Sequence, residues 1–198
     1  TMRVPRRHVV ADQVSQEIGR LTRAIELSVE QLEAIRGRFV GGGMDHQTII
    51  EAHEMMLRDP SLFDEAAELI RDEKISAEWA VSRVIARLRS LFDRVPSAYL
   101  RERGGDVDFV GERIIRNLVG KEADITQMLR NLGNETIVVA HDLSPADTAI
   151  LGKYQVTAFV TEVGGKTSHT SIVARSLDVP AVVGVTGIFD SVGMGDVM

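Results

Sequence analysis

The pattern of apolar residues changes near residue 120, and this change limits the folds open to the chain. From Asp12 to Leu118 apolar residues recur at steps of three and four, which is typical of amphipathic helices. After about Lys121, short β-branched runs alternate with helix-like segments, which indicates a compact α/β arrangement. The pattern therefore predicts an α+β chain of two subdomains, a bundle of helical hairpins and a compact α/β domain.

Glycine, proline and capping residues divide the first part of the chain into five helices. The Gly41-Gly42-Gly43 triplet ends the first helix, and we interpret it as a turn because no strand precedes it and no Lys-Ser or Lys-Thr pair follows it. Asp59 is a typical helix cap, with Pro60 at the first helical position. Short loops favour antiparallel neighbours and hence helical hairpins. The predicted helices cover about residues 12–39, 45–58, 60–72, 76–95 and 97–118.

The second part of the chain predicts strands over residues 136–140, 156–161 and 181–183, a helix over 144–152 and another helix at His169. The apolar pair Val9-Val10 suggests that residues 3–10 return as an edge strand of the same sheet. The helical bundle is then an insertion within the α/β domain. This organisation gives an α/β domain from residues 1–11 and 121–198, and a helical domain from residues 12–120.

Composition excludes several classes of function. The net charge of −6 and the few basic clusters argue against a nucleic-acid partner. No run of about 18 apolar residues and no signal-peptide pattern is present, so neither a membrane span nor export is expected. The absence of cysteine excludes a disulfide scaffold and a thiolate metal site and agrees with a cytoplasmic location. The five histidines show no metal-type spacing, so no metal site is expected within this chain.

The segment from Gly164 to Arg175 carries the clearest chemistry: Gly-Gly-Lys-Thr-Ser-His-Thr-Ser-Ile-Val-Ala-Arg. A strand precedes it and a helix follows, so His169 falls in a first helical turn, where backbone N–H groups and the helix dipole favour an anion. A neutral imidazole there can attack phosphorus, and the surrounding hydroxyls can stabilise phosphoryl oxygens. The segment therefore predicts a phosphohistidine site. Its hydroxyl donors are Thr167, Ser168, Thr170 and Ser171, its close backbone approach comes from Gly164 and Gly165, and its countercharge from Lys166 or Arg175.

Continuing through Asp178-Val179-Pro180-Ala181-Val182-Val183-Gly184, the segment resembles the active-site signature of phosphoenolpyruvate-utilising enzymes. Among them it most resembles Enzyme I of the bacterial sugar phosphotransferase system, whereas dikinases typically have Ala-Ala in place of Thr170-Ser171. The resemblance extends through the helical part, from about Ala11 to Gly120. A lone histidine beside serine and threonine is usually part of a helix cap. The length of this match favours the active-site interpretation.

The resemblance implies that His169 accepts, through Nε2, a phosphoryl group that originates on phosphoenolpyruvate and passes it to the histidine of a small phosphocarrier protein. It also implies a swivelling α/β domain and a separate C-terminal barrel that binds phosphoenolpyruvate and Mg²⁺. That barrel is an expected partner, and the sequence is expected to be a fragment cut at both ends. Thr148 is expected to approach the active histidine, although a hydroxyl bonding to its own helix backbone is the alternative.

The resemblance further places a carrier-binding face on the helical part. Met55, Met56 and Leu57 cannot all point inward because consecutive residues lie about 100° apart on a helix. Either one of them is an ordinary surface residue, or the group is a docking surface with adaptable methionine contacts. Gly104-Gly105 stands where relatives have helix formers, which predicts bending or fraying near Arg103. The implied carrier-binding residues are His53, Met55, Met56, Leu57, Asp59, Tyr99, Leu100 and Arg103.

Three other interpretations stay open. The chain could be the nitrogen-related paralogue of Enzyme I, a dikinase-like swivelling domain, or a carrier-binding module without activity. The long helical insertion disfavours a dikinase, and the intact Thr-Ser-His-Thr-Ser cluster disfavours an inactive module.

Overall fold

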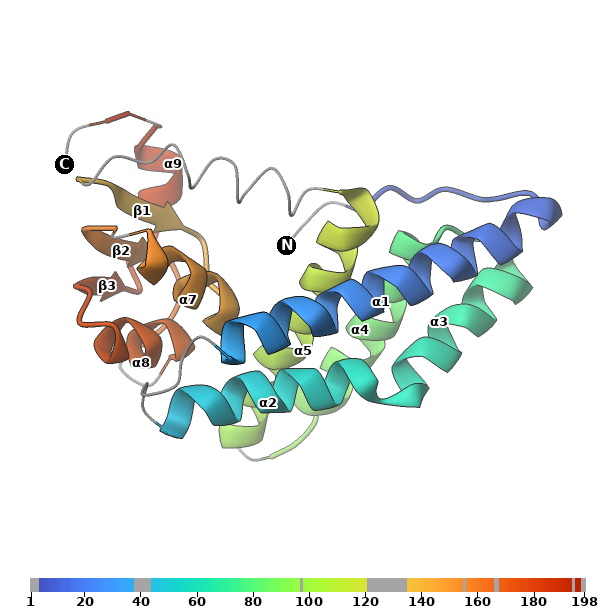
Figure 1. The fold of residues 1–198 in the computed structure, drawn as a ribbon, viewed down its shortest axis with the longest axis horizontal. Coiled ribbons are helices and arrows are strands. Elements are labelled where there is room, and N and C mark those ends of the chain that lie inside the picture. Colours follow the sequence, from blue (N-terminus) through green and yellow to red (C-terminus); the bar gives the residue numbers. More distant parts are fainter. Residues whose placement is uncertain are drawn as a thin grey trace. The chain divides into compact units, whose positions relative to one another are not determined.

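A computed structural model of the chain describes residues 4–37, 44–96, 98–120, 135–154, 156–165, 168–193 and 195–196. The chain divides into two compact units, whose elements are labelled in Figure 1. A helical unit comprises Thr1–Glu33 with Ala52–Ala123, and an α/β unit comprises Ala34–Glu51 with Asp124–Met198. The combination of a helix-rich part with a small sheet confirms the predicted α+β class.

The helices of the first part begin close to the residues that the capping signals predicted. The Asp59 side chain accepts a hydrogen bond from the Ser61 N–H at 2.9 Å, and Pro60 is the first residue of the helix that follows. The Ser76 hydroxyl caps the next helix by accepting from the Trp79 N–H at 3.5 Å. The elements are η1 Ala11–Gln13, α1 Val14–Arg36, α2 Met44–Arg58, α3 Pro60–Glu73, α4 Ala77–Asp93 and α5 Ala98–Val119.

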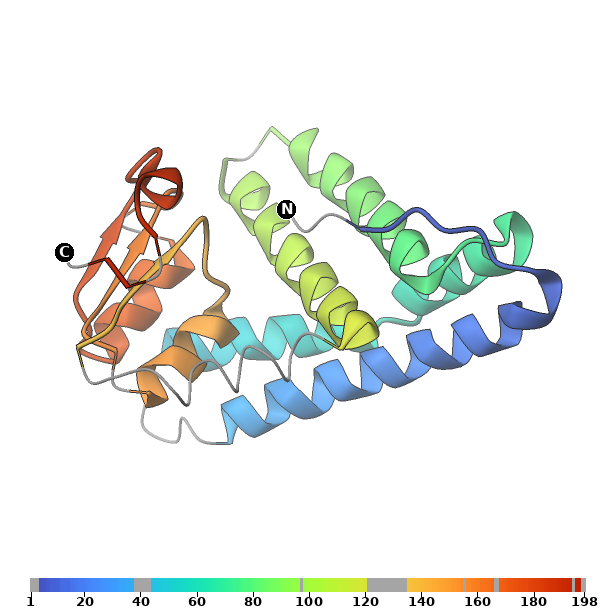
Figure 2. The same cartoon turned by 90° about the horizontal axis from the view of Figure 1, so that it is seen from above.

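Helices α4 and α5 run side by side as a hairpin (Figure 2), and α3 packs against α4. Their apolar faces supply buried side chains, among them Ile70, Val81 and Ile114. Burial of such side chains from water is what stabilises an amphipathic helix, since its backbone hydrogen bonds are internal.

The predicted interruption at Gly104-Gly105 is wrong, because α5 is continuous through both glycines. The reason is close packing against α4. A Cβ atom at Gly104 would lie 3.0 Å from the Phe92 Cβ, and one at Gly111 would lie 2.5 Å from the Ile85 Cγ1. The missing side chains let α4 and α5 approach, and the gain in packing offsets the low helix propensity of glycine.

The N-terminal segment also differs from the expectation of an edge strand in the α/β sheet. His8 forms an isolated antiparallel bridge with Ile75, and the Val9 N–H donates to the Lys74 carbonyl at 2.8 Å. The described residues of this segment therefore belong with the α3–α4 connection of the helical unit. Val9 is buried there, which satisfies the apolar position that suggested a strand.

The α/β unit contains a three-stranded parallel sheet of order β1-β2-β3. Each connection crosses over through a helix, and α7 and α8 lie next to each other on the same side of the sheet (Figure 1). Right-handed crossovers between adjacent parallel strands give this arrangement. The elements are β1 Ile137–Ala140, α7 Pro145–Lys153, β2 Ala158–Thr161, α8 His169–Ser176, β3 Ala181–Val183 and α9 Ile188–Ser191.

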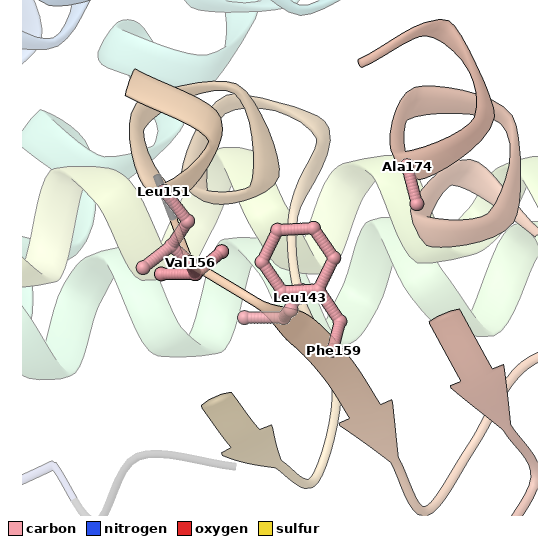
Figure 3. Close-up of a cluster of buried hydrophobic side chains, with 5 residues drawn as sticks. All are labelled: Leu143, Leu151, Val156, Phe159 and Ala174. Atoms are coloured by element: carbon pink, nitrogen blue, oxygen red, sulfur yellow. The ribbon is translucent and has the colours of Figure 1, made fainter. Parts of the chain in front are cut away.

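A small apolar core joins this sheet to its two crossover helices. Figure 3 shows the ring of Phe159 rising from β2 among apolar side chains of α7, α8 and their connections. Phe159 is fully buried on the central strand, so the core fixes β2 and with it the turn into α8. The buried cluster comprises Leu143, Leu151, Val156, Phe159 and Ala174.

Candidate functional site

Helix α8 begins at the carboxyl end of the central strand, and His169 is its first residue. Ser168 is the N-cap: its hydroxyl accepts from the Ser171 N–H at 3.3 Å. The Ser171 hydroxyl in turn donates to the Gly165 carbonyl at 2.8 Å. These bonds tie the first turn of α8 to the preceding glycines, so the sequence places His169 at a capped helix N-terminus as predicted.

The turn before α8 needs glycine at one position. Gly164 has φ +115°, and a Cβ atom there would lie 3.1 Å from the Ser168 Oγ. Gly184 follows β3 directly, and a Cβ atom there would lie 3.2 Å from the Gly164 carbonyl oxygen. The backbone after β2 and the backbone after β3 therefore approach closely, which side chains at these positions would prevent.

Two of the predicted catalytic hydroxyls are buried. Thr170 donates to the Leu143 carbonyl at 3.2 Å, which ties α8 to the loop after β1. Thr148 donates to the carbonyl of Ser144 at 3.0 Å, four residues earlier and directly before its own helix. Both side chains therefore hold the scaffold of the turn. This finding favours the backbone-bonding interpretation of Thr148, which the sequence left open.

The predicted cationic residues receive unequal support. Lys166, Thr167 and the side chain of His169 lie outside the described residues. Arg175 lies in the last turn of α8, six residues after His169. Since a helix rises about 1.5 Å per residue, Arg175 is about 9 Å along the axis from the N-terminus. The countercharge role of Arg175 at His169 therefore stays a prediction.

Sequence reasoning missed a hydrogen-bonded pair at the same edge of the sheet. His141 follows β1 and Glu162 follows β2, and the His141 Nδ1 lies 2.6 Å from the Glu162 Oε2. The hydrogen bond from His141, with backbone N–H groups of Phe189 and Gly187, holds the pKa of the Glu162 carboxyl below its ordinary value. The signal that could have found the pair is positional: both residues come directly after strands, and adjacent parallel strands end at the same edge.

The predicted carrier-binding residues on α2 divide by burial. Met55 is 73% exposed, whereas His53 and Leu57 are 3% exposed. The His53 Nε2 lies 3.2 Å from the Asp106 Oδ1 on α5, so this pair braces the bundle. Direct contact of His53 and Leu57 with a partner is therefore corrected to an internal role. The side chains of Tyr99, Leu100 and Arg103 lie outside the described residues.

A cavity of about 180 Å³ opens beside these residues in the helical unit. Met56 and Asp59, both predicted as carrier-binding residues, line it with apolar side chains from α3, α4 and α5. The apolar lining with one carboxylate at the α3 N-terminus suits an apolar side chain of another protein. The lining residues are Met56, Asp59, Ser61, Leu62, Ile85, Leu88, Phe92, Val107 and Val110.

No group of three or more His, Cys, Asp or Glu side chains that could hold a metal ion occurs in the part of the chain that the structure describes. Within the same residues, no helix has both the length and the apolar character needed to cross a bilayer.

Two family models match the chain. The model of "PEP-utilising enzyme, N-terminal" matches residues 1–103, and that of "PEP-utilising enzyme, mobile domain" matches residues 132–198. The phosphoenolpyruvate-protein phosphotransferase of Enterococcus faecalis is 40% identical over 92% of this chain and 32% of that protein. The protein of the same name from Haemophilus influenzae is 35% identical over 95% of this chain and 32% of that protein. The chain thus spans about a third of the length of the curated relatives it matches.

Two solved structures share the fold. The NMR solution structure of Enzyme I (nEIt) has 36% identity and a TM-score of 0.75, and the match covers 99% of this chain and 78% of that one. The structure of the N-terminal domain of Enzyme 1 - Nitrogen has 27% identity and a TM-score of 0.68, over 92% of this chain and 72% of that one. The chain therefore belongs to the family of PEP-utilising enzymes, and its sequence and fold resemble the N-terminal part of Enzyme I.

Proposed function

We propose that this chain is the phosphohistidine-bearing part of a phosphoenolpyruvate-protein phosphotransferase, with His169 as the residue that carries the phosphoryl group. The single observation that supports this most is the position of His169 as first residue of a serine-capped helix at the carboxyl edge of a parallel sheet. Ligands of open α/β sheets bind at this edge, and helix N-termini bind phosphate.

For this reaction the protein mainly has to position the two imidazoles and the phosphoryl group. In the reversible step with the carrier, the P–N bond of the carrier phosphohistidine breaks as a P–N bond to His169 forms, and the electron pair returns to the carrier imidazole. Charge on the phosphoryl oxygens is stabilised by N–H groups of the α8 N-terminus and by nearby donors. Nε2 as the attacking atom stays a prediction.

The residues proposed for the site are revised by the geometry. Ser168 and Ser171 shape the first turn, and Gly164 and Gly165 allow the backbone to approach the phosphoryl group. Lys166 and Thr167 keep their proposed roles as countercharge and donor. Thr148 and Thr170 act as positioning residues, and Arg175 keeps its proposed role as a countercharge.

The helical unit is proposed as the docking surface for a small histidine-containing phosphocarrier protein. Met55 presents an exposed apolar side chain, and Met56 and Asp59 line the adjacent cavity. Apolar anchors that fill such pockets, with charge at the rim, are typical of binding hot spots. Tyr99, Leu100 and Arg103 stay proposed members of this surface. We keep residue 120 as the proposed boundary between the carrier-binding part and the phosphohistidine part.

The whole reaction needs more than this chain. Since the chain spans about a third of its curated relatives, we assign phosphoenolpyruvate binding, and the Mg²⁺ that goes with it, to a C-terminal part of the longer protein. That part is then a partner of the α8 site. A cytoplasmic location and a role in sugar uptake go with this proposal and rest on resemblance alone.

The test is transfer of label from a bacterial phosphocarrier protein bearing ³²P on its histidine. We expect acid-labile label on the 198-residue chain and none on His169→Ala, with His8→Ala as the matched histidine control. Label that survives His169→Ala would refute the site. Binding of the carrier without transfer to the wild-type chain would instead support an inactive carrier-binding module.

A second candidate is the nitrogen-related enzyme, since the N-terminal domain of Enzyme 1 - Nitrogen shares the fold at 27% identity. The higher identity to the Enzyme I structure, 36%, favours the sugar system. Competition between sugar-type and nitrogen-type phosphocarriers for labelling of the chain distinguishes the two: the cognate carrier saturates at the lower concentration.

A further inference from the structure

We propose that His141 and Glu162 form a positioning pair that holds the Gly164-Gly165 turn, so that the rate of phosphoryl transfer at α8 depends on their hydrogen bond. This inference rests on the proposed function of His169. It adds two residues that act through the backbone of the turn rather than by touching the phosphoryl group.

The first support is the geometry of the pair itself. The Nδ1–Oε2 distance is 2.6 Å, short enough for a strong bond to an ionised acceptor. The Glu162 side chain is only 16% exposed, whereas that of His141 is 61% exposed. The carboxylate is thus the fixed member of the pair, and the imidazole covers it from the solvent side.

The second support is what else the Glu162 carboxylate binds. Its Oε1 accepts from the Phe189 N–H at 3.4 Å, and the backbone N–H of Gly187 also helps to lower the pKa of the carboxyl. Both N–H groups lie at the start of α9, which follows β3: Gly187 is its N-cap and Phe189 is in its first turn. One side chain therefore links the ends of β1 and β2 to the start of α9, which an isolated surface pair does not do.

The third support is how closely the pair is coupled to the turn. The Val163 N–H donates to the His141 carbonyl at 3.1 Å, and the Val185 N–H donates to the Thr161 carbonyl at 3.0 Å. These bonds extend the ladder past both edges of β2. Gly164, which follows directly, is packed against Gly184. A shift of Glu162 would therefore pass to Gly164 and to the start of α8.

Other charges near the pair are few among the described residues. Asp142 follows His141 and uses one oxygen to accept from the Leu143 N–H at 2.8 Å. Asp190 follows Phe189 on α9 and is exposed. Asp190→Asn is therefore a matched control, since it removes a neighbouring carboxylate without touching the pair.

The experiment measures the initial rate of ³²P transfer from the phosphorylated carrier to the chain as a function of carrier concentration. We expect His141→Ala and Glu162→Gln each to lower the maximal rate about five- to tenfold, as loss of one intramolecular hydrogen bond would. The half-saturating carrier concentration should change less than about twofold, because the docking surface is unaltered. The double variant should lose little more than either single one, since the two residues act as a unit.

A conservative variant separates positioning from simple folding defects. His141→Asn places an amide N–H near the position of Nδ1 but cannot become charged. We expect it to recover the transfer rate to within about twofold of the wild type, because an amide donor can keep the hydrogen bond to the Glu162 carboxylate. If His141 acted through packing alone, His141→Asn would be as slow as His141→Ala.

Two results would overturn the proposal while leaving the function of His169 intact. One is a wild-type rate in both Glu162→Gln and His141→Ala. The other is loss of rate in His141→Ala and His141→Asn with a normal rate in Glu162→Gln, which would mean that His141 contacts the phosphoryl group directly. Absence of label on the wild-type chain is a different outcome, because it refutes the proposed function first.

Discussion

The two units of the molecule bury different kinds of polar groups. Among the described residues, the helical unit buries carboxylates, a histidine and an arginine, whereas the buried polar side chains of the α/β unit all carry hydroxyls. The helical set is Glu17, Ser28, His53, Glu54, Ser76, Glu78, Asp106 and Arg113, and the α/β set is Ser144, Thr148, Thr161 and Thr170.

The difference follows from how each unit connects its elements. A helix satisfies its backbone internally, so links between helices need side chains, and charged side chains reach furthest. Arg20 of α1 donates to Glu17 at 2.7 Å, to Glu78 of α4 and to the Leu118 carbonyl of α5 at 3.0 Å. Parallel strands are already joined by backbone bonds. The buried threonine hydroxyls of the α/β unit donate hydrogen bonds to nearby backbone carbonyls. The Thr161 hydroxyl, for example, donates to the Val163 carbonyl at 2.7 Å.

Under the proposed reaction, this difference between the two units affects how each responds to added charge. A phosphoryl group would bring negative charge to the α/β unit at each turnover. Among the described residues of this unit, the buried polar side chains are neutral hydroxyls, so the added charge does not disturb a buried ion. The fold of the unit is therefore expected to be insensitive to phosphorylation. The charged interior lies in the unit proposed for docking.

The largest effect should come from breaking the charged links of the helical unit. Arg20→Met leaves the Glu17 and Glu78 carboxylates buried without their shared cation, so we expect unfolding free energy to fall by about 3 kcal/mol. Urea denaturation followed by fluorescence of Trp79 measures it, because the only tryptophan of the chain lies on α4. Arg23→Met is the control: its pairs with Glu26 and Glu30 are exposed, and loss of less than about 1 kcal/mol is expected. Equal losses for the two arginines would contradict the comparison.

The second effect concerns glycines, which the helical unit uses for close packing. Gly111→Ala should lower the unfolding free energy by about 2 kcal/mol, because its Cβ would overlap the buried Ile85. Gly105→Ala should instead raise it by about 0.5–1 kcal/mol, since the nearest atom would be 3.8 Å away and alanine favours the helix. Thermal unfolding of both variants measures the difference in sign. Destabilisation by Gly105→Ala would mean that α5 bends there after all.

The glycines of α5 illustrate which features of the fold could not be predicted from the sequence. Local signals predicted helix starts well, because a cap such as Asp59 or Ser76 is read from neighbouring residues. The continuity of α5 through Gly104 depends on Phe92 of another helix, and the bridge of His8 depends on Ile75. Such contacts between distant residues have no signature within one segment.

The candidate site divides in the same way. The strand, glycine turn and capped helix at His169 could be predicted, since all of them lie within a dozen neighbouring residues. The burial of Thr170 could not, because its acceptor is Leu143, 27 residues away. The pair of His141 with Glu162 needed the strand order, which the sequence pattern leaves undetermined.

A smaller effect should appear on acidification, again in the helical unit. Burial by itself raises the pKa of Glu17, but hydrogen bonds from the Ala77 N–H and Arg20 and the nearby arginine charges outweigh it and bring the pKa below its ordinary value of 4.5. The folded chain therefore binds the proton less readily than the unfolded one. The resulting stability is present above pH 4.5 and is lost as the pH falls through the lower folded value.

The measurement is the urea midpoint of Trp79 fluorescence between about pH 6 and pH 3, which should fall in the wild type. Glu17→Gln should show a shallower fall, because one of the titrating carboxyls is gone. The effect should stay below that of Arg20→Met, since a protonated carboxyl keeps part of its hydrogen bonding. Identical pH dependence in the two proteins would show that Glu17 does not contribute to acid sensitivity.

The smallest effect should come from a buried hydroxyl of the α/β unit, and it tests the other half of the comparison. Thr161→Val keeps the shape of the side chain but removes the donor to the Val163 carbonyl, so a loss of about 1 kcal/mol is expected. Hydrogen exchange of the β2 amides measures it within the unit itself. Because no charge is removed, the loss should be the same at pH 4 and pH 7, unlike that caused by Glu17→Gln. A loss that changed with pH would mean that the hydroxyl is coupled to the neighbouring Glu162 carboxylate, and the interior of the α/β unit would then be less electrically neutral than its side chains suggest.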